Sequence, residues 1–141
     1  MLKILSPYDQ SLIKEIPLEG LDEVEKMLQT ADDLFLDRSK WIPAHERIGI
    51  LERTVKLMNN RIDELTKIAT QEGGKPLTDS KVEVLRAING VKLASENISQ
   101  LKGEEIPMGL TKASENRLAF TMREPIGIVA SVSAFNHPLN L

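Results

Sequence analysis

The sequence predicts a mixed α/β fold in which amphipathic helices precede a short, buried β-strand. Between positions 21 and 101, apolar residues recur at alternating steps of three and four, the spacing that lines one face of an α-helix. Beyond position 116 this periodicity is lost, and an apolar run rich in β-branched residues occupies positions 126–132. A run with so little alternation is typical of a strand buried on both faces of a parallel sheet.

The composition limits the classes of protein to which the chain can belong. Its 141 residues, 41% hydrophobic and 28% charged, indicate one globular domain with one core. The net charge of −3 gives no electrostatic basis for binding nucleic acid or an anionic membrane. The sequence contains no cysteine, which excludes disulfides and thiolate metal sites. Since it also shows neither a signal peptide nor an apolar run of membrane-spanning length, we expect a cytoplasmic protein.

The first 36 residues are expected to form a small β-hairpin and a first helix. Residues 6–11 combine Pro7 and Asp9 with polar neighbours, so they predict a turn between two short strands. The helix begins near position 21 with acidic residues in its first turn, where they favour the helix dipole. Its inner face consists of Leu21, Val24, Leu28, Ala31 and Phe35.

Two further helices are expected between prolines and glycines. Pro43 suits the start of a long second helix, and Gly73-Gly74 suits its end. The inner face of this helix carries Ile48, Leu51, Val55, Met58, Ile62, Leu65 and Ala69. The third helix lies between Pro76 and Gly103 and carries Leu85, Ile88, Val91, Ser95, Ile98 and Leu101. The carboxylates and lysines between these faces are expected to be solvated.

Two strands are expected after the helices, over residues 117–123 and 126–132. A strand that is buried on both faces needs neighbouring strands and covering layers. The nine residues after Val132 are too few for a crossover helix and a second parallel strand. We therefore expect the natural chain to continue past Leu141.

Five segments resemble the aldehyde dehydrogenase superfamily, in the order in which that family has them. They are Ser-Pro-Tyr-Asp at 6–9, Trp41 with Glu46-Arg47, Glu-Gly-Gly-Lys-Pro at 72–76, Arg-Glu-Pro-Ile-Gly-Ile-Val at 123–129 and Phe-Asn-His-Pro at 135–138. The matches are in register and cover nearly the whole chain. Because chains of this family are much longer, the resemblance implies its N-terminal portion.

The resemblance implies an N-terminal hairpin, three amphipathic helices, and then a strand pair leading into the first strand of an incomplete Rossmann-like cofactor domain. Residues 1–141 would be the N-terminal part of the cofactor-binding domain, with the catalytic domain absent. The implied activity is oxidation of a small aldehyde to a carboxylic acid with NAD or NADP, through a cysteine thiohemiacetal. The intact enzyme would be a homo-oligomer, a dimer or tetramer. The 141-residue chain lacks the thiol and is expected to be inactive alone.

Asn136 is the catalytic residue that the resemblance implies. In this family the signature Asn donates a hydrogen bond to the oxyanion that forms when the thiolate attacks the aldehyde. The alternative is an Asn that only shapes the turn before Pro138. The preceding residues are implied to line the nicotinamide half of the cofactor, and their alternative is a strand end with Phe135 in a core. These cofactor-binding candidates are Val132, Ser133, Ala134 and Phe135.

Several other features predict no additional site. Residues 72–76 lack the spacing of a Walker loop and predict a helix end followed by a turn. His45 and His137, the two histidines, have no carboxylates at metal-ligand spacing, so no metal site is expected. Phe135 and His137 stand where the family more often has Trp and another aromatic residue, which leaves the substrate open.

A second class of function is a stand-alone helical interaction module or a truncated, non-catalytic paralogue. The missing thiol favours it. The reading frame beyond Leu141 separates the two classes, because the enzyme requires a cysteine-containing catalytic domain there.

Overall fold

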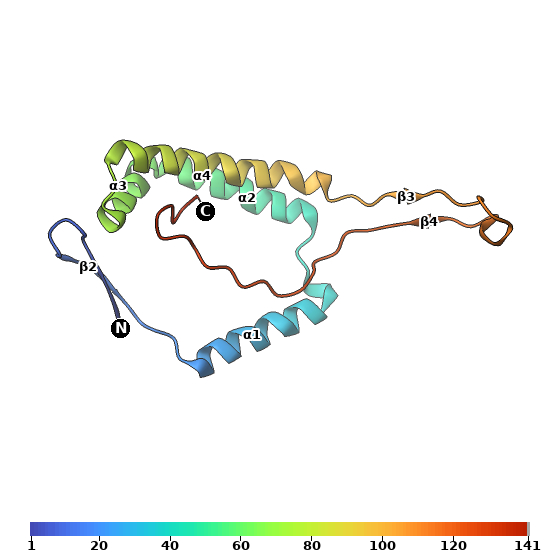
Figure 1. The fold of residues 1–141 in the computed structure, drawn as a ribbon, viewed down its shortest axis with the longest axis horizontal. Coiled ribbons are helices and arrows are strands. Elements are labelled where there is room, and N and C mark those ends of the chain that lie inside the picture. Colours follow the sequence, from blue (N-terminus) through green and yellow to red (C-terminus); the bar gives the residue numbers. More distant parts are fainter. Residues whose placement is uncertain (141) are drawn as a thin grey trace.

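The structure, a computed structural model, describes residues 1–140 and has the mixed α/β character that the sequence predicts. Its elements within this range are β1 (Leu2–Leu5), β2 (Leu12–Ile16), α1 (Leu21–Leu36), α2 (Ala44–Asn60), α3 (Ile62–Gly73), α4 (Leu77–Asn97), β3 (Glu105–Ile106) and β4 (Ala119–Phe120). In Figure 1, α4 lies along α2 and α3, and the β3–β4 ribbon extends away from the helices. No helix in this range combines the length and apolar character needed to cross a bilayer.

The predicted N-terminal hairpin is confirmed. Strands β1 and β2 pair antiparallel, with Leu2 opposite Ile16. Their connecting turn is closed by a backbone hydrogen bond of 2.9 Å from Ser6 N–H to Ser11 O. Asp9 stabilises the turn because its carboxylate accepts from the Ser11 backbone N–H at 3.1 Å and from the Ser11 hydroxyl at 2.8 Å.

Helix α1 begins where the sequence predicts, and its N-terminus is capped by its own first turn. The Glu23 carboxylate accepts a 3.0 Å hydrogen bond from the Gly20 N–H, one of the donors that a helix leaves unsatisfied there. Its inner face is half-buried at Ala31 and Phe35 only, whereas Leu21 is 83% exposed. Near the other end, Trp41 stacks on Phe35 and donates to the Phe35 carbonyl at 3.0 Å.

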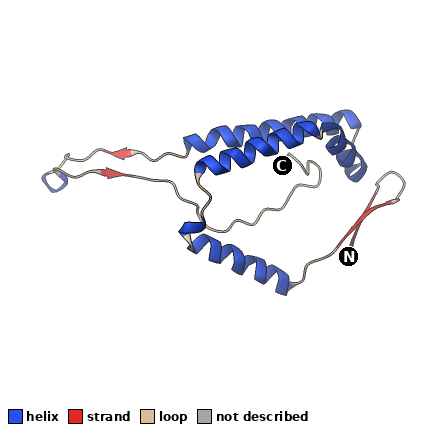
Figure 2. Ribbon diagram, turned by 180° about the vertical axis from the view of Figure 1, so that it is seen from behind, coloured by secondary structure: helices blue, strands red, loops and turns tan. Residues whose placement is uncertain are grey.

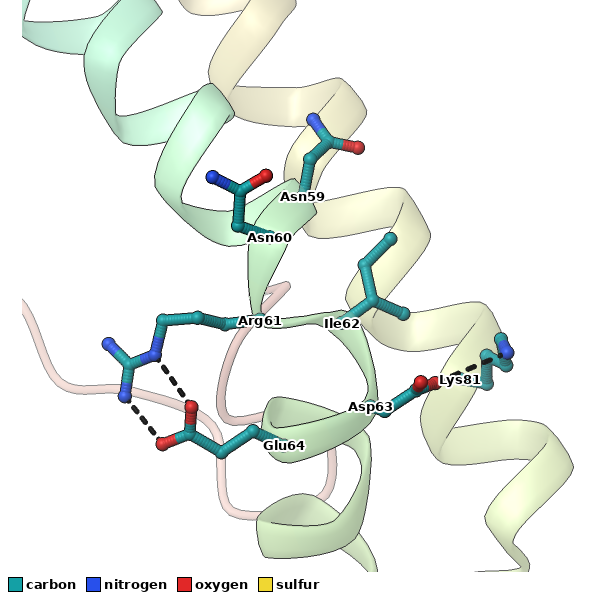
Figure 3. A pocket seen from close by; sticks show the side chains of 7 residues that line it. All are labelled: Asn59, Asn60, Arg61, Ile62, Asp63, Glu64 and Lys81. Carbon is teal, nitrogen blue, oxygen red and sulfur yellow. Dashed lines mark hydrogen bonds and ion pairs between the residues drawn. The ribbon is translucent and has the colours of Figure 1, made fainter.

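The predicted long second helix is wrong in one respect: it is two helices, α2 and α3, separated at Arg61 (Figure 3). Arg61 has φ −120° and ψ 19°, and its N–H bonds to Met58 O rather than one residue further back. Asn59 and Asn60, which precede it, are weak helix formers. The Arg61 guanidinium then pairs with Glu64 in the first turn of α3, at 2.7 and 2.8 Å. The local sequence thus ends one helix and starts another.

The core lies where α4 packs against α2 and α3. Its buried apolar side chains are Ala69, Val84, Ala87 and Ile88. Of the face predicted for the third helix, Ile88 and Ser95 on α4 are buried, but Leu85 is 47% exposed, and Leu101, which lies beyond the end of α4, is 55% exposed. Because α4 contacts two helices rather than one, its buried face begins earlier, at Ser80 and Glu83.

The turn between α3 and α4 depends on Gly74. This residue has φ +63°, in the left-handed region that glycine accepts, and its N–H closes α3 by bonding to Thr70 O at 2.9 Å. A Cβ at Gly74 would lie 3.2 and 3.3 Å from the Pro7 ring. The predicted helix stop is therefore confirmed, and the hairpin turn packs directly on it.

The β3–β4 ribbon is the remaining sheet in residues 1–140. Glu105 pairs with Phe120 and Ile106 with Ala119, antiparallel, so the predicted strand 117–123 is reduced to two paired residues. Figure 2 shows the ribbon projecting from the helices, and next to it Thr121 N–H bonds to Glu104 O at 2.9 Å.

The predicted buried strand over 126–132 does not form in this structure, which corrects that expectation. Ile126, Val129 and Val132 are 93%, 73% and 96% exposed. A parallel strand is defined by hydrogen bonds to a neighbour, and within residues 1–140 the backbone of this segment makes none. The segment instead runs back past the helices as extended chain (Figure 1).

We predict that Gly74→Ala lowers the free energy of unfolding by roughly 1–2 kcal/mol, the usual cost of a left-handed conformation for a residue with a Cβ. Contact with Pro7 adds to this cost. The matched control is Gly90→Ala within α4, where a Cβ meets nothing within 4 Å, and it should stabilise by roughly 0.5–1 kcal/mol. Urea denaturation measures both, and equal effects of the two variants would contradict the assignment.

Candidate functional site

The site residues predicted from the sequence lie in the C-terminal segment, which folds back onto the α3–α4 turn (Figure 1). A cavity of about 370 Å³ opens there between three parts of the chain: the hairpin turn, the end of α3 and this segment. It is lined by Pro7, Ala69, Glu72, Gly73, Lys75, Phe135, Asn136 and Pro138. The structure therefore brings Phe135 and Asn136 to one cavity, whereas Val132, Ser133 and Ala134 lie outside its lining.

A buried carboxylate underlies this cavity. The Glu83 side chain, on α4, is fully buried and forms an ion pair with Lys75. Its other oxygen, Oε1, accepts a 3.0 Å hydrogen bond from the backbone N–H of Leu139. The expectation that such carboxylates are solvated is wrong here. The missed signal was spacing, because Glu83 lies three residues after Ser80 and four before Ala87, on the face that α4 buries.

Lys75 connects α4 to the segment that carries Asn136. Besides pairing with Glu83, its ammonium donates to the Asn136 carbonyl oxygen at 3.0 Å and lies 3.5 Å from His137 Nδ1. The three ammonium donors are thus all directed at neighbouring groups. Residues 72–76 form the predicted helix end and turn, and this turn places Lys75 in the lining of the cavity.

The electrostatics of the cluster keep Glu83 ionised. Burial raises the pKa of this carboxyl, but hydrogen bonds from Lys75 and the Leu139 N–H outweigh burial, helped by the charges of Lys75 and His137. The pKa of Glu83 therefore lies below its usual value of 4.5. A buried charge is tolerated only when it is paired and hydrogen-bonded, and both conditions hold here.

The side chain of Asn136 is exposed, whereas its backbone carbonyl is hydrogen-bonded to Lys75. The residue is exposed, and among residues 1–140 its side-chain amide makes no hydrogen bond. The turn is closed by other groups: Asn140 N–H bonds to His137 O at 3.2 Å, and the Ser133 hydroxyl donates to Pro138 O at 2.9 Å. Phe135 is 92% exposed, so it is not a core residue in this structure.

A second cavity of similar volume lies at the break between α2 and α3 and contains none of the residues predicted for the site (Figure 3). Arg61 bonds to Glu64 across its mouth, and this hydrogen bond lowers the pKa of the Glu64 carboxyl. Lys81 lies 3.5 Å from Asp63. Its charged side chains are engaged in exposed ion pairs.

Comparison with known proteins places the chain in a family. The model of the aldehyde dehydrogenase family matches residues 1–141. The lactaldehyde dehydrogenase of Methanocaldococcus jannaschii is 36% identical over 140 residues, which cover 99% of this chain and 29% of that protein. The 3-sulfolactaldehyde dehydrogenase of Priestia aryabhattai is 33% identical with the same coverage. The chain thus spans less than a third of the length of these relatives.

Solved structures agree in fold. The glyceraldehyde-3-phosphate dehydrogenase of Methanocaldococcus jannaschii, complexed with NADP, has a TM-score of 0.88 at 35% identity, over 99% of this chain and 29% of that one. Aldehyde dehydrogenase 21 of Physcomitrella patens, in complex with succinate, has a TM-score of 0.92 at 28% identity and the same coverage. With the family model matching its whole length, this chain belongs to the aldehyde dehydrogenase family and matches the N-terminal part of that fold.

Proposed function

We propose that this chain is the N-terminal part of the cofactor-binding domain of an enzyme that oxidises an aldehyde to a carboxylic acid with NAD or NADP. The observation that carries the proposal is Asn136, whose backbone is tethered while its side-chain amide is exposed beside a cavity. A fixed backbone with an available N–H donor is what electrostatic stabilisation of a developing charge requires.

In the proposed reaction, a thiolate adds to the carbonyl carbon and the C=O electron pair moves onto oxygen. The side-chain N–H of Asn136 donates a hydrogen bond to that oxyanion. Residues 132–135 would hold NAD(P)⁺, which when bound would supply the hydride acceptor that oxidation of the aldehyde requires. Since the sequence has no cysteine, the thiol and the general-base Glu would come from residues outside it.

The cofactor-binding role of residues 132–135 is also a proposal. Val132 and Phe135 are 96% and 92% exposed, so their apolar surfaces are accessible to a planar ring. The Ser133 hydroxyl already donates to Pro138 O, which leaves only its lone pairs available to accept from a ligand. Ala134 is half-buried. The arrangement supports apolar contact with the cofactor from Val132 and Phe135 more than hydrogen bonding from Ser133.

For the substrate we propose a small aldehyde that carries a polar or anionic group. The relatives named for lactaldehyde and 3-sulfolactaldehyde, at 36% and 33% identity, support this choice. A malonate-semialdehyde dehydrogenase of Bacillus cereus, 34% identical over 134 residues, supports it further. Their named substrates share a hydroxyl, sulfonate or carboxylate near the carbonyl.

We predict that the full-length enzyme has a kcat/KM at least about tenfold higher for lactaldehyde than for hexanal, because a site built for polar groups loses their hydrogen bonds with an alkyl chain. Steady-state rates of NAD(P)H formation give the ratio. A preference for hexanal would remove the substrate proposal and leave the reaction class standing.

We predict that the purified 141-residue chain reduces no NAD(P)⁺ in the presence of lactaldehyde, since it has no thiol to attack the carbonyl. Absorbance at the NAD(P)H band measures this directly. Aldehyde-dependent turnover by this chain would show that the proposed cysteine chemistry is wrong.

In the full-length enzyme, Asn136→Ala should slow acylation by roughly 10²–10³-fold, the usual loss for one oxyanion donor. Asn136→Asp should be as slow, because it replaces the donor with an acceptor of the same shape. The pre-steady-state burst of NAD(P)H measures the step. Asn97→Ala is the control, since Asn97 bonds only to Leu93 O at the exposed end of α4. A wild-type burst from Asn136→Ala would exclude Asn136 from the mechanism.

A further inference from the structure

We propose that Lys75 and Glu83 are positioning residues for Asn136. Their buried ion pair joins the α3–α4 turn to α4, and the hydrogen bonds from the pair to the C-terminal segment hold the Asn136 peptide at the cavity. The proposal rests on the catalytic role of Asn136 given above. It assigns a role to two residues that do not touch the reacting atoms. Through them, the helical part of the chain determines the position of Asn136.

Few contacts besides these hydrogen bonds hold the C-terminal segment in place. Phe135, Asn136 and Pro138 are all exposed, so burial of side chains contributes little to fixing residues 135–138. The tethers to the helices are polar: Lys75 Nζ to Asn136 O at 3.0 Å, and Glu83 Oε1 to Leu139 N–H at 3.0 Å. These two bonds fix the peptide groups on either side of His137.

The ion pair between Lys75 and Glu83 makes bonds that stability alone does not require. For stability alone, two well-packed apolar side chains usually serve as well as a buried ion pair. Here Glu83 bonds through its second oxygen to the Leu139 N–H, and Lys75 donates to the Asn136 carbonyl, both of which are backbone groups of the segment. An apolar pair could fill the same space, but it could not bond to the Asn136 carbonyl or to the Leu139 N–H.

As a consequence, the backbone of Asn136 is fixed. The position of its side-chain amide then depends only on the two side-chain torsion angles. Displacement of a catalytic group by about 1 Å can slow a reaction on the order of 10²-fold. Loss of the Lys75 tether should therefore reduce the rate of acylation without removing the amide itself.

The test measures the acylation burst of the full-length enzyme for Lys75→Met, in the wild-type background and in the Asn136→Ala background. If Lys75 acts through Asn136, the substitution slows acylation roughly 10²-fold in the first background and little in the second. Equal slowing in both would overturn the proposal. Lys81→Met is the matched control, because Lys81, on α4, lies in an exposed ion pair with Asp63 and should leave the burst unchanged.

A double variant separates positioning from folding. Lys75→Met or Glu83→Leu alone leaves one buried charge unpaired and should lower the unfolding midpoint. The double variant K75M/E83L removes both charges, so its midpoint should recover, while its acylation should stay slow because both tethers are gone. Recovery of the burst together with the midpoint would overturn the proposal, since the pair would then be structural only. If the double variant does not fold, the effect of Lys75→Met in the wild-type and Asn136→Ala backgrounds still tests the proposal.

Acid unfolding supplies a readout independent of activity. Because the pKa of Glu83 is lowered in the folded protein, its contribution to stability is present above pH 4.5 and is lost as the pH falls through that lowered value. Lys75 and His137 are the charged groups that act on this carboxyl. The unfolding midpoint of K75M/E83L should therefore fall less than that of the wild type between about pH 6 and about pH 3. If the unfolding midpoints of K75M/E83L and the wild type fall equally, the ion pair is not formed and the proposal is overturned.

The same variants distinguish the two proposals. If Asn136→Ala shows a wild-type burst, the catalytic role of Asn136 fails, and the positioning role fails with it. If Asn136→Ala is slow and Lys75→Met is not, the positioning role alone fails.

Discussion

The arrangement of the site depends on one buried ion pair, between Lys75 and Glu83. A carboxylate without solvent must be paired, and its remaining lone pairs must also be satisfied. Glu83 meets the first need with Lys75 and the second with the Leu139 N–H, so the charge on α4 determines where the C-terminal segment lies. Gly74 is also needed, because its left-handed backbone conformation turns the chain so that Lys75, the next residue, lines the cavity.

Much of the fold could be predicted from periodicity and turn residues. The hairpin, the inner face of α2 and α3 and the stop at Gly74 all follow from local preferences. The break at Arg61 was missed because the apolar repeat continues through it from Met58 to Ile62, so the hydrophobic pattern is the same for one helix or two. The available signal was chemical rather than periodic: a pair of weak helix formers followed by acidic residues suited to a first turn.

The parts that could not be predicted involve contacts that local patterns do not reveal. The spacing of Glu83 puts it on the buried face of α4, but its hydrogen bond to the Leu139 N–H joins residues that are 56 positions apart, and no local pattern indicates it. The run 126–132 has the composition of a strand, but strand formation also requires a hydrogen-bonding neighbour, and residues 1–140 provide none. Asn136 was singled out by its motif. Lys75 also lies in a motif, the segment 72–76, but neither that motif nor the position of Glu83 on α4 indicates that these two residues hold the Asn136 segment.

The tethers also bear on the order in which the molecule assembles. The turn between α3 and α4 brings these helices together after only a few residues of connecting chain, so their contact closes a short loop. The bond from Lys75 to Asn136 closes a loop of 61 residues and that from Glu83 to Leu139 one of 56. Chain entropy opposes long closures more than short ones. We expect the helical pair to form first and the C-terminal segment to dock last, which faster amide hydrogen exchange at Leu139 than at Val84 would reveal.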